Sequence, residues 1–321
     1  MTVSQIKKMT TAVQIVAGPV KIRPVEVGEN LCVMPHVAPA PAPTSSRAVL
    51  AQTSCAYQVA VVKIGGTAIN NIDVLDALID DAIALSRAGV KVVVVHGGGI
   101  SVNEALRAVG KETVKVAGLR VTDADTLAIA VDVFTAINEQ LAAKFKEKGA
   151  CAIGFSPATT SPFISKKMEL EGTGDLGFVG EIVAVDAAQI ESWMWAGWIP
   201  IVSPIGAAGR QLYNINADHA ALALACQLQA DGLYFMTDVP GVLQDVDDKD
   251  SRIGHLTSDA AEALIADGTI SGGMLPKIRS CLGALKNGIG RIAILDGFAC
   301  EALVAGYLAP SENGTLITGE H

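Results

Sequence analysis

The feature that most constrains the fold is a pattern of apolar strand, glycine turn and helix, which begins at Val59 and repeats along the chain. A buried strand entering a turn is expected at QVAVVKIGG, an amphipathic helix at VLDALIDDAIALSRAG, and a second strand and turn at VKVVVVHGGG. Strands connected through helices form parallel sheets covered by helices on both faces. We therefore predict an α/β fold: an open, mainly parallel twisted sheet with helices on both faces, an αβα sandwich.

Later segments continue this pattern. Further strands are expected at CAIGFS, WIPIVSPIG, GLYFMTD and RIAILDG, with helices that begin near Asn103, Asp125, Ala217, Thr257 and Pro276. The segment SPFISKKMELEGTGDLGFVGEIVAV differs, because it has the character of antiparallel strands inserted at a sheet edge. These elements predict one sheet in two lobes.

Composition excludes several functional classes. The chain has 321 residues, of which 50% are apolar and only 4% aromatic, as is typical of helices packed on a buried parallel sheet. A net charge of −9 provides no basic surface for nucleic acid, and no apolar run is long enough to span a membrane. The six cysteines are scattered without a CxxC pair, which argues against a zinc cluster or a disulfide framework. We expect reduced thiols, no metal held by the protein, and a cytoplasmic location.

Residues 1–57 differ from the rest and are expected to form an N-terminal extension. Apolar residues at helical spacing predict a helix over Val3–Val16, and MPHVAPAPAPTSSR is a linker rich in proline and alanine. Lys7 and Lys8 are not followed by a continuous apolar segment, so no secretory signal is expected. A tail, an oligomerisation segment and a targeting segment remain open for this extension.

Three glycine-rich elements carry the chemical signal. KIGG and HGGG each follow a strand, and DGTISGGMLPK leads into a helix. Glycine lets backbone N–H groups approach a phosphate, and Lys277 at a helix start is unfavourable unless an anion lies there. Together with Lys63 at the end of the first strand, these elements favour phosphoryl transfer over a structural role. No G-x-G-x-x-G follows a strand and no Walker A motif occurs.

The ordered set KIGG, HGGG, GLRVTD, YNINAD, TDVPGVL and DGTISGGMLPK resembles the amino-acid kinase superfamily from about Val59 to the C-terminus. Within it, GLRVTD and YNINAD are similar to the N-acetyl-L-glutamate kinases, which phosphorylate a side-chain carboxylate with ATP in arginine biosynthesis. The resemblance implies an amino-acid kinase domain over 58–321, with an acetylglutamate-binding lobe (58–205) and an ATP-binding lobe (206–321). It implies ATP with Mg²⁺ as the cofactor.

The resemblance also implies roles for individual residues of this chain. The catalytic set is Lys63, Lys277, Asp218, Gly65 and Gly66, in which the aspartate orients the two lysines. Acceptor binding is implied for Gly98, Gly99, Arg120 and Asn214. Nucleotide binding is implied for Thr237, Asp238, Gly241, Gly272 and Gly273. Helix capping would explain Asp218 alone, but it does not explain Asn214 and Asn216 beside it.

The implied nucleophile is a carboxylate, which is ionised at pH 7, so the reaction needs no general base. His96 is accordingly expected to be a packing residue of its turn. A binding or regulatory subunit without catalysis, or a paralogue of different specificity, is the alternative, and the set of Lys63, Arg120, Asn214, Asp218 and Lys277 favours the enzyme.

Departures from the family pattern concern the acyl group and regulation. GFSPATTSPF replaces a glycine-rich charged loop near the acceptor, which leaves the acyl group open. In the arginine-inhibited branch that the resemblance brings in, an N-terminal helix interlaces dimers and a C-terminal carboxylate holds the effector. Gly306 stands where that carboxylate is expected, and Glu312 replaces a turn glycine. We expect a homodimer, extended to a higher homo-oligomer only through residues 1–57, with weak or absent arginine inhibition.

Overall fold

The computed structural model describes residues 45–50, 58–157, 159–170, 172 and 174–319, which belong to one compact unit, Pro41–His321. The helix expected over Val3–Val16 lies outside the described residues. None of the helices in the described ranges has the length and apolar character that a membrane crossing needs.

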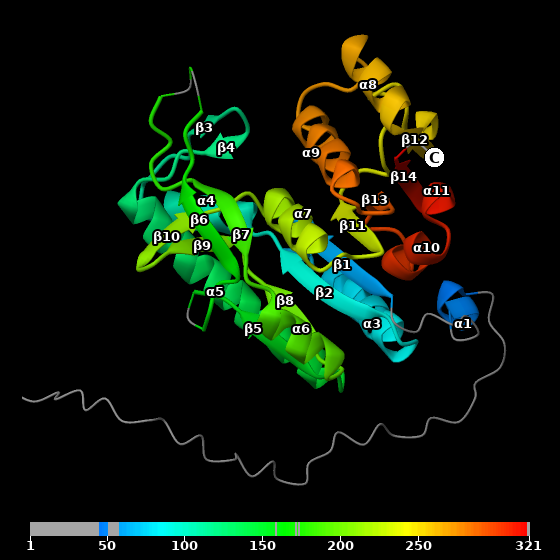
Figure 1. The fold of residues 1–321 in the computed structure, drawn as a ribbon, viewed down its shortest axis with the longest axis horizontal. Coiled ribbons are helices and arrows are strands. Elements are labelled where there is room, and N and C mark those ends of the chain that lie inside the picture. Colours follow the sequence, from blue (N-terminus) through cyan, green and yellow to red (C-terminus); the bar gives the residue numbers. More distant parts are fainter. Residues whose placement is uncertain (1–44, 51–57, 158, 171, 173, 320–321) are drawn as a thin grey trace, which may run out of the picture. The chain divides into compact units, whose positions relative to one another are not determined.

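An eight-stranded sheet forms the centre of this unit (Figure 1). Its strand order is β12-β14-β13-β11-β1-β2-β8-β5, and every neighbouring pair is parallel except β13 with β14. The predicted open, mainly parallel sheet is confirmed. The strands are β1 (Val59–Ile64), β2 (Lys91–His96), β5 (Ala152–Phe155), β8 (Ile199–Val202), β11 (Gly232–Thr237), β12 (His255–Thr257), β13 (Ile292–Asp296) and β14 (Gly314–Thr318).

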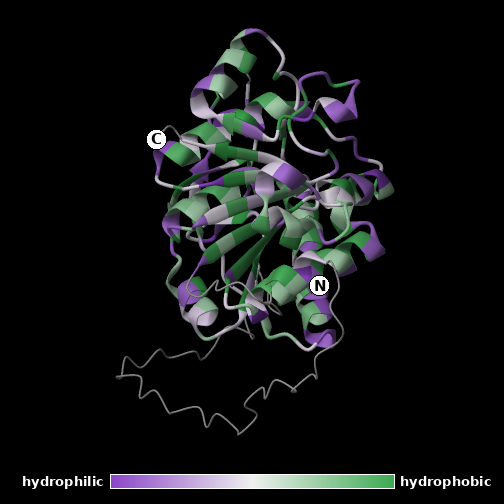
Figure 2. Ribbon diagram, turned by 90° about the vertical axis from the view of Figure 1, so that its right-hand side faces the viewer, coloured by the Kyte–Doolittle hydropathy of each residue, from purple (hydrophilic) through white to green (hydrophobic). Residues whose placement is uncertain are grey.

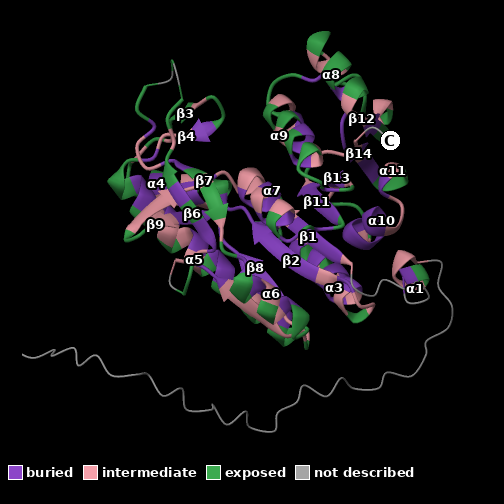
Figure 3. Cartoon of the chain, in the orientation of Figure 1, coloured by how far each residue is buried: buried purple, intermediate pink, exposed green. Residues whose placement is uncertain are grey.

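Alternate residues of the central strands enter two separate cores, because successive side chains of a strand point to opposite faces. Val62 and Val94 pack with α3 (Ile72–Arg87), α4 (Gly99–Ala108), α5 (Ala124–Glu147) and α10 (Ala302–Leu308). Val61 and Val93 pack with α6 (Ala188–Trp195), α7 (Ala217–Gln227), α8 (Ser258–Ala266) and α9 (Met274–Lys286). The central strands are hydrophobic in Figure 2 and buried in Figure 3, as a sheet covered on both faces requires.

A second sheet is a difference from the single sheet expected. The segment WIPIVSPIG is not one strand, because it divides into β8 in the main sheet and β9 (Ile205–Ala208) in a four-stranded sheet. Pro204, which has no N–H for a ladder, lies at the division. The second sheet has the order β10-β9-β6-β7, with β6 (Phe163–Lys167), β7 (Gly180–Val185) and β10 (Gln211–Asn214). The predicted antiparallel pairing of β6 with β7 is present.

The remaining elements are short. The two-stranded hairpin β3 (Lys115–Val116) and β4 (Leu119–Arg120) carries one of the expected site residues. The helix α2 (Gly66–Ile69) follows the first glycine turn, η2 (Lys249–Ser251) is a 3-10 helix, and α11 (Pro310–Asn313) precedes β14.

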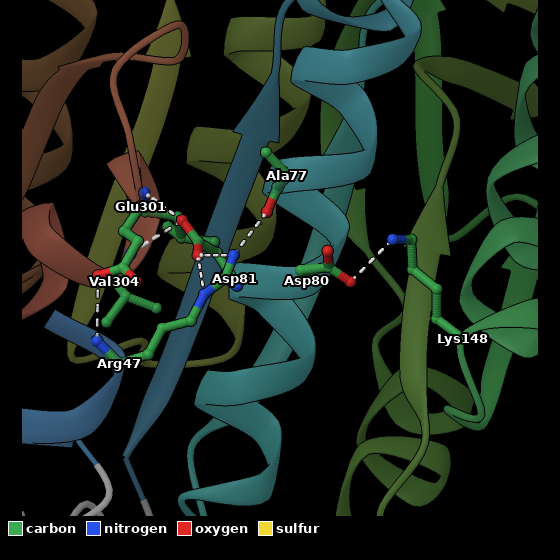
Figure 4. A network of polar contacts seen from close by, with 8 residues as sticks. Arg47, Ala77, Asp80, Asp81, Lys148, Glu301 and Val304 are labelled. Carbon is green, nitrogen blue, oxygen red and sulfur yellow. Dashed lines mark hydrogen bonds and ion pairs between the residues drawn. The ribbon is translucent and has the colours of Figure 1, made fainter. Parts of the chain in front are cut away.

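The helix α1 (Ser46–Leu50) lies at the end of the segment expected to be a linker, and an ion pair with a buried carboxylate fixes it to the core (Figure 4). Arg47 on α1 contacts the Asp81 carboxylate of α3 at 2.7 Å, and only 1% of the Asp81 side chain is exposed. The same carboxylate accepts hydrogen bonds from the backbone N–H groups of Leu303 and Val304 at the start of α10. Burial raises the pKa of Asp81, while the Arg47 guanidinium and the two amides partly offset that effect.

Candidate active site

The ends of three adjacent strands bring the glycine turns together. In the sheet register Lys63 of β1 pairs with Val95 of β2 and with Phe235 of β11. The turns KIGG and HGGG and the segment after β11 therefore leave the same edge of the sheet side by side. Ligands of open parallel sheets bind at the carboxyl ends of the strands, so this edge is the candidate site.

Asp218 joins the two lysines at the centre of this edge. Its Oδ1 lies 2.8 Å from Lys63 Nζ, and its Oδ2 accepts a hydrogen bond from Lys277 Nζ. All three side chains are largely buried, with exposed fractions of 13% for Lys63, 14% for Lys277 and 20% for Asp218. Lys277 Nζ also lies 4.5 Å from the centroid of the Phe235 ring. The structure thus unites the three expected catalytic side chains, which come from β1, α7 and α9.

The charges in this cluster do not cancel. Burial alone would raise the pKa of Asp218, but the positive charges of Lys63 and Lys277 outweigh burial and hold it far below its ordinary value. Burial lowers the pKa of Lys277, an effect that the Asp218 carboxylate opposes and Lys63 reinforces. With one carboxylate between two ammonium groups, the cluster keeps one net positive charge, which suits a site for anions.

Asn216, rather than Asp218, caps the helix. The Asn216 side chain accepts hydrogen bonds from the backbone N–H groups of Asp218 (2.8 Å) and His219 (3.3 Å) at the start of α7. The expectation that capping does not explain Asn216 is therefore wrong. This cap leaves both Asp218 carboxylate oxygens available to the lysines.

The glycine turns form a cradle of backbone amides. A Cβ atom at Gly66 would lie 3.5 Å from the Gly99 nitrogen, 3.6 Å from the Ile100 nitrogen and 3.7 Å from the Gly98 nitrogen. Within the described residues, the Gly98 and Gly99 amides donate to no other protein atom. A methyl group at residue 66 would thus occupy the space that these amides face, so glycine keeps an anion-sized position open.

A pocket of about 320 Å³ lies beside this cradle. Arg120 lines it and is held by two hydrogen bonds, to Thr113 Oγ1 (3.0 Å) and to the Gly99 carbonyl oxygen (2.9 Å). Burial lowers the pKa of Arg120. In the described part of the chain no carboxylate pairs with this guanidinium. A half-buried guanidinium without a counterion is suited to a carboxylate ligand.

Asn214 lines the same pocket from β10 and is connected to Arg120 through Thr122. The Asn214 side-chain amide donates to Thr122 Oγ1 (3.1 Å), and that hydroxyl donates to the Arg120 carbonyl oxygen (2.7 Å). Gly177, in the DLGF segment (residues 175–178), pairs with Thr122 through an isolated β-bridge. The DLGF segment therefore passes between the two strands that carry the expected acceptor residues.

A second pocket, of about 420 Å³, opens on the other side of the lysine pair. Lys63 and Lys277 line it together with five further expected site residues: Gly65, Gly66, Thr237, Asp238 and Gly273. Two expected nucleotide-binding residues line neither pocket. Gly241 packs instead against Thr315, and Gly272 lies in the turn before α9 at φ +53°.

No group of three or more potential metal-ligating side chains occurs among the residues that the structure describes. The carboxylate nearest the centre, Asp218, is engaged by two lysines. Beside the carboxylates of Asp218 and Asp238, the two pockets present the cations Lys63, Lys277 and Arg120 and the backbone amides of the glycine turns.

Sequence reasoning did not identify Thr113, Lys115 or Thr122 as parts of the site. Lys115 lines the same pocket as Arg120, from the hairpin, and the two threonines hold Arg120 and Asn214. The motif GLRVTD contained Thr122, but its hydroxyl acts on a partner 92 positions away, which no local pattern shows.

Known proteins similar to this chain come from one family. The amino acid kinase family matches residues 58–296. An acetylglutamate kinase of Desulfitobacterium hafniense is 40% identical over 267 residues, covering 80% of this chain and 89% of its own length. The acetylglutamate kinase of Brachyspira hyodysenteriae is 37% identical over 258 residues, with the same coverage of 80% and 89%.

The fold is also found among solved structures. An N-acetylglutamate synthase from Neisseria gonorrhoeae complexed with coenzyme A and N-acetyl-glutamate superposes with a TM-score of 0.74 at 24% identity. The superposition covers 86% of this chain and 62% of that one, so this chain spans less than two thirds of the synthase. At this identity the likeness concerns the fold alone.

Proposed function

The chain belongs to the amino acid kinase family, and on that premise we propose that it transfers the γ-phosphoryl group of ATP to the γ-carboxylate of N-acetyl-L-glutamate, a step of arginine biosynthesis. Both relatives described above, at 37% and 40% identity, are acetylglutamate kinases. The observation that carries the proposal is the Lys63–Asp218–Lys277 cluster, which lies between two pockets and keeps a net positive charge.

The acceptor would bind in the pocket of Arg120 and Asn214. The guanidinium would hold the α-carboxylate, and the side-chain carboxylate would extend toward Lys63 and the glycine cradle. The acyl group would lie against the apolar part of the wall, which includes Leu119, Val179 and Pro204. Because the nucleophile is already ionised at neutral pH, no side chain has to remove a proton.

Transfer brings two anions together, and the chain's own residues reduce their repulsion. One carboxylate oxygen of the acceptor forms a bond to the γ-phosphorus, and the bond to the oxygen that bridges the β- and γ-phosphates breaks. Lys63 and the amides of Gly66, Gly98 and Gly99 would stabilise the transferred group, and Lys277 the departing ADP. Asp218 would hold both ammonium groups at their positions.

Nucleotide binding is assigned to the second pocket, which Thr237, Asp238 and Gly273 line. ATP would bring Mg²⁺ on its phosphates, where the ion neutralises charge on the leaving group. This arrangement fits the chain, since its central carboxylate is already paired with lysines.

We assign residues 58–321 to the kinase domain and residues 1–57 to an extension. Asn214 ends β10, which pairs with β9 in the four-stranded sheet, so Asn214 reaches the acceptor pocket from the acceptor-binding lobe. A boundary between the acceptor and nucleotide lobes after Asn214 fits this pairing better than the expected boundary at 205. A homodimer in the cytoplasm remains part of the proposal.

Hydroxamate trapping of the acyl phosphate tests the function. Purified protein with ATP is given N-acetylglutamate, glutamate, N-acetylaminoadipate, aspartate or carbamate, and Lys63→Met serves as the control for contaminating kinases. N-acetylglutamate should give the highest kcat/KM. Turnover with none of these acceptors would favour a non-catalytic subunit, and a preference for another acceptor would overturn the substrate assignment.

A further inference from the structure

His96 is a buried polar residue directly behind the glycine cradle. It ends β2, immediately before Gly97, and none of its surface is exposed. Its ring meets two polar groups: Nδ1 lies 2.8 Å from the Gly97 carbonyl oxygen and Nε2 lies 3.3 Å from Asn138 Nδ2. No step of the proposed reaction uses this ring.

These two contacts select one form of the imidazole. A carbonyl oxygen only accepts and an amide NH₂ only donates, so Nδ1 must carry the proton and Nε2 must be the acceptor. In the other tautomer, an unprotonated Nδ1 would face the Gly97 carbonyl oxygen, and an Nε2–H would face the Asn138 amide NH₂. The first contact would pair two acceptors and the second would pair two donors. Burial lowers the pKa of His96 to about 4, so the ring stays neutral at physiological pH. A neutral ring with both nitrogens engaged inside the protein serves neither as a base nor as a metal ligand.

The orientation of Asn138 is itself fixed. Its Nδ2 lies 3.0 Å from the Ile201 carbonyl oxygen and 3.4 Å from that of Phe155, so it faces the backbones of β8 and β5. A Cβ atom at Gly154 would lie 2.0 Å from Asn138 Oδ1, so only glycine leaves room for this side chain. The sheet thus holds Asn138, and Asn138 holds the ring of His96.

The consequence for the cradle follows from the planar trans peptide. The Gly97 carbonyl and the Gly98 N–H belong to one peptide unit and point in opposite directions. Because the carbonyl is directed to His96 in the interior, the N–H is directed away from it. The Gly98 nitrogen is one of the three that face the Gly66 position on the pocket side.

We propose that His96 is a positioning residue for phosphoryl transfer: its Nδ1–H holds the Gly97 carbonyl inward and thereby aims the Gly98 N–H at the transferred phosphoryl group. The proposal rests on the function proposed above. Asn138 acts one step further back, by keeping the ring in the orientation and tautomer that this hydrogen bond needs.

Two substitutions separate this role from packing. In His96→Asn the side-chain amide nitrogen can take the place of Nδ1 and donate to the Gly97 carbonyl. In His96→Gln the amide reaches the place of Nε2 and leaves that carbonyl without its donor. Since one oxyanion donor is worth about 10²–10³ in kcat, we expect His96→Gln to lose about 100-fold and His96→Asn no more than about tenfold. Both KM values should stay within about threefold of wild type.

The control is His255→Asn, a change at an exposed histidine that bonds Thr318, which should leave kcat unchanged. Equal kcat for the two His96 variants, at equal folded fractions by circular dichroism, would overturn the proposal, as would a loss confined to KM. If wild-type protein transfers no phosphoryl group, the function fails independently. Nitrogen-15 spectra of the wild type then test the geometry by itself: the Nδ1–H tautomer, with a shift of the Gly98 amide on adding ADP with aluminium fluoride, supports the hydrogen bond that aims this amide at a bound phosphoryl mimic. The other tautomer, or an unshifted amide, refutes it.

Discussion

Two lysines share one carboxylate in the candidate site, and each has a separate task in the proposed reaction. We predict that Lys63→Met and Lys277→Met each reduce kcat on the order of 10²-fold or more, because both cations act on charge that develops during transfer. Steady-state kinetics with circular dichroism on both variants measures this. Lys286→Met is the matched control, since Lys286 is exposed on the same helix as Lys277. Turnover near the wild-type rate in either site variant would refute the mechanism.

Arg120 differs from these lysines because its guanidinium has a fixed shape. Two of its nitrogens already donate to Thr113 and to the Gly99 carbonyl, which sets the direction of the remaining N–H groups. We expect Arg120→Lys to raise KM for the acceptor at least tenfold, since a point charge does not reproduce bidentate binding, which is worth about 1.5–3 kcal/mol. KM for ATP should change little. Initial rates at varied concentrations of each substrate test this, and equal changes in both KM values would count against the assignment.

At the scale of the element, the DLGF segment depends on one glycine. Gly177 has φ +70°, and a Cβ atom there would lie 2.2 Å from the Thr122 carbonyl oxygen. Gly174, directly before this segment, has φ +76° with no neighbour within 4 Å. Gly177→Ala should therefore combine backbone strain with a clash, about 2–4 kcal/mol in all, and raise acceptor KM by displacing Thr122.

Gly174→Ala is the matched control, because it carries only the strain, about 1–2 kcal/mol. Urea unfolding and the acceptor KM of the two variants distinguish the effect of backbone strain from that of the clash. Identical losses of stability with unchanged KM in both would show that the DLGF segment does not support the pocket.

A second element, α1, depends on the pair of Arg47 and Asp81. Arg47→Ala would leave a carboxylate of 1% exposure with only the two amides of α10 as partners. We expect the free energy of unfolding to fall by about 2–3 kcal/mol, with kcat unchanged, because α1 lines neither pocket. Thermal unfolding measures the loss, and Arg87→Ala, on the exposed face of α3, is the control. A melting temperature equal to that of the control would show that the pair contributes nothing.

At the scale of the whole molecule, the expected weakness of arginine inhibition gains a steric reason. A Cβ atom at Gly306 would lie 2.3 Å from Leu295 Cδ1, so α10 packs on β13 with no room for a side chain. We predict a homodimer and no inhibition by arginine below the millimolar range. Light scattering and arginine titration of the full chain, of a protein beginning at Pro41 and of one beginning at Ala56 test this. The protein that begins at Pro41 keeps α1, whereas the one that begins at Ala56 lacks it. Inhibition of the full chain at micromolar arginine, abolished by truncation, would contradict the prediction.

Much of the fold and part of the site could be predicted from sequence, because those features are local. Lys63 and the glycines after it follow directly from an apolar strand, and the helix start at Ala217 was visible in its polar residues. Which of those polar residues caps and which binds lysine was not visible. Asn216 and Asp218 stand two positions apart at the start of α7, and only the long-range approach of Lys277 separates their roles.

The other differences have the same origin. The division of WIPIVSPIG between two sheets depends on the partners available to β9, which lie at β6 and β10. The helix α1 forms next to its partner Asp81, which is 34 positions away. Such contacts are decided by tertiary packing, which overrides local preference.

One wall of the pocket that contains Arg120 and Asn214 is held by isolated bridges, and these bear on its motion. Thr122 meets Gly177, and Val179 meets Asn214, through isolated bridges rather than a continued ladder. Bridges of this kind can open locally while the eight-stranded sheet stays intact. The amides of Thr122, Phe178 and Asn214 should then exchange with solvent through small openings and slow when an acceptor is bound. Part of the binding free energy of an acceptor is then used to order the pocket. The affinity of the pocket for an acceptor therefore depends on this entropy cost as well as on direct contacts, and molecules that fail to close the bridges are selected against on both grounds.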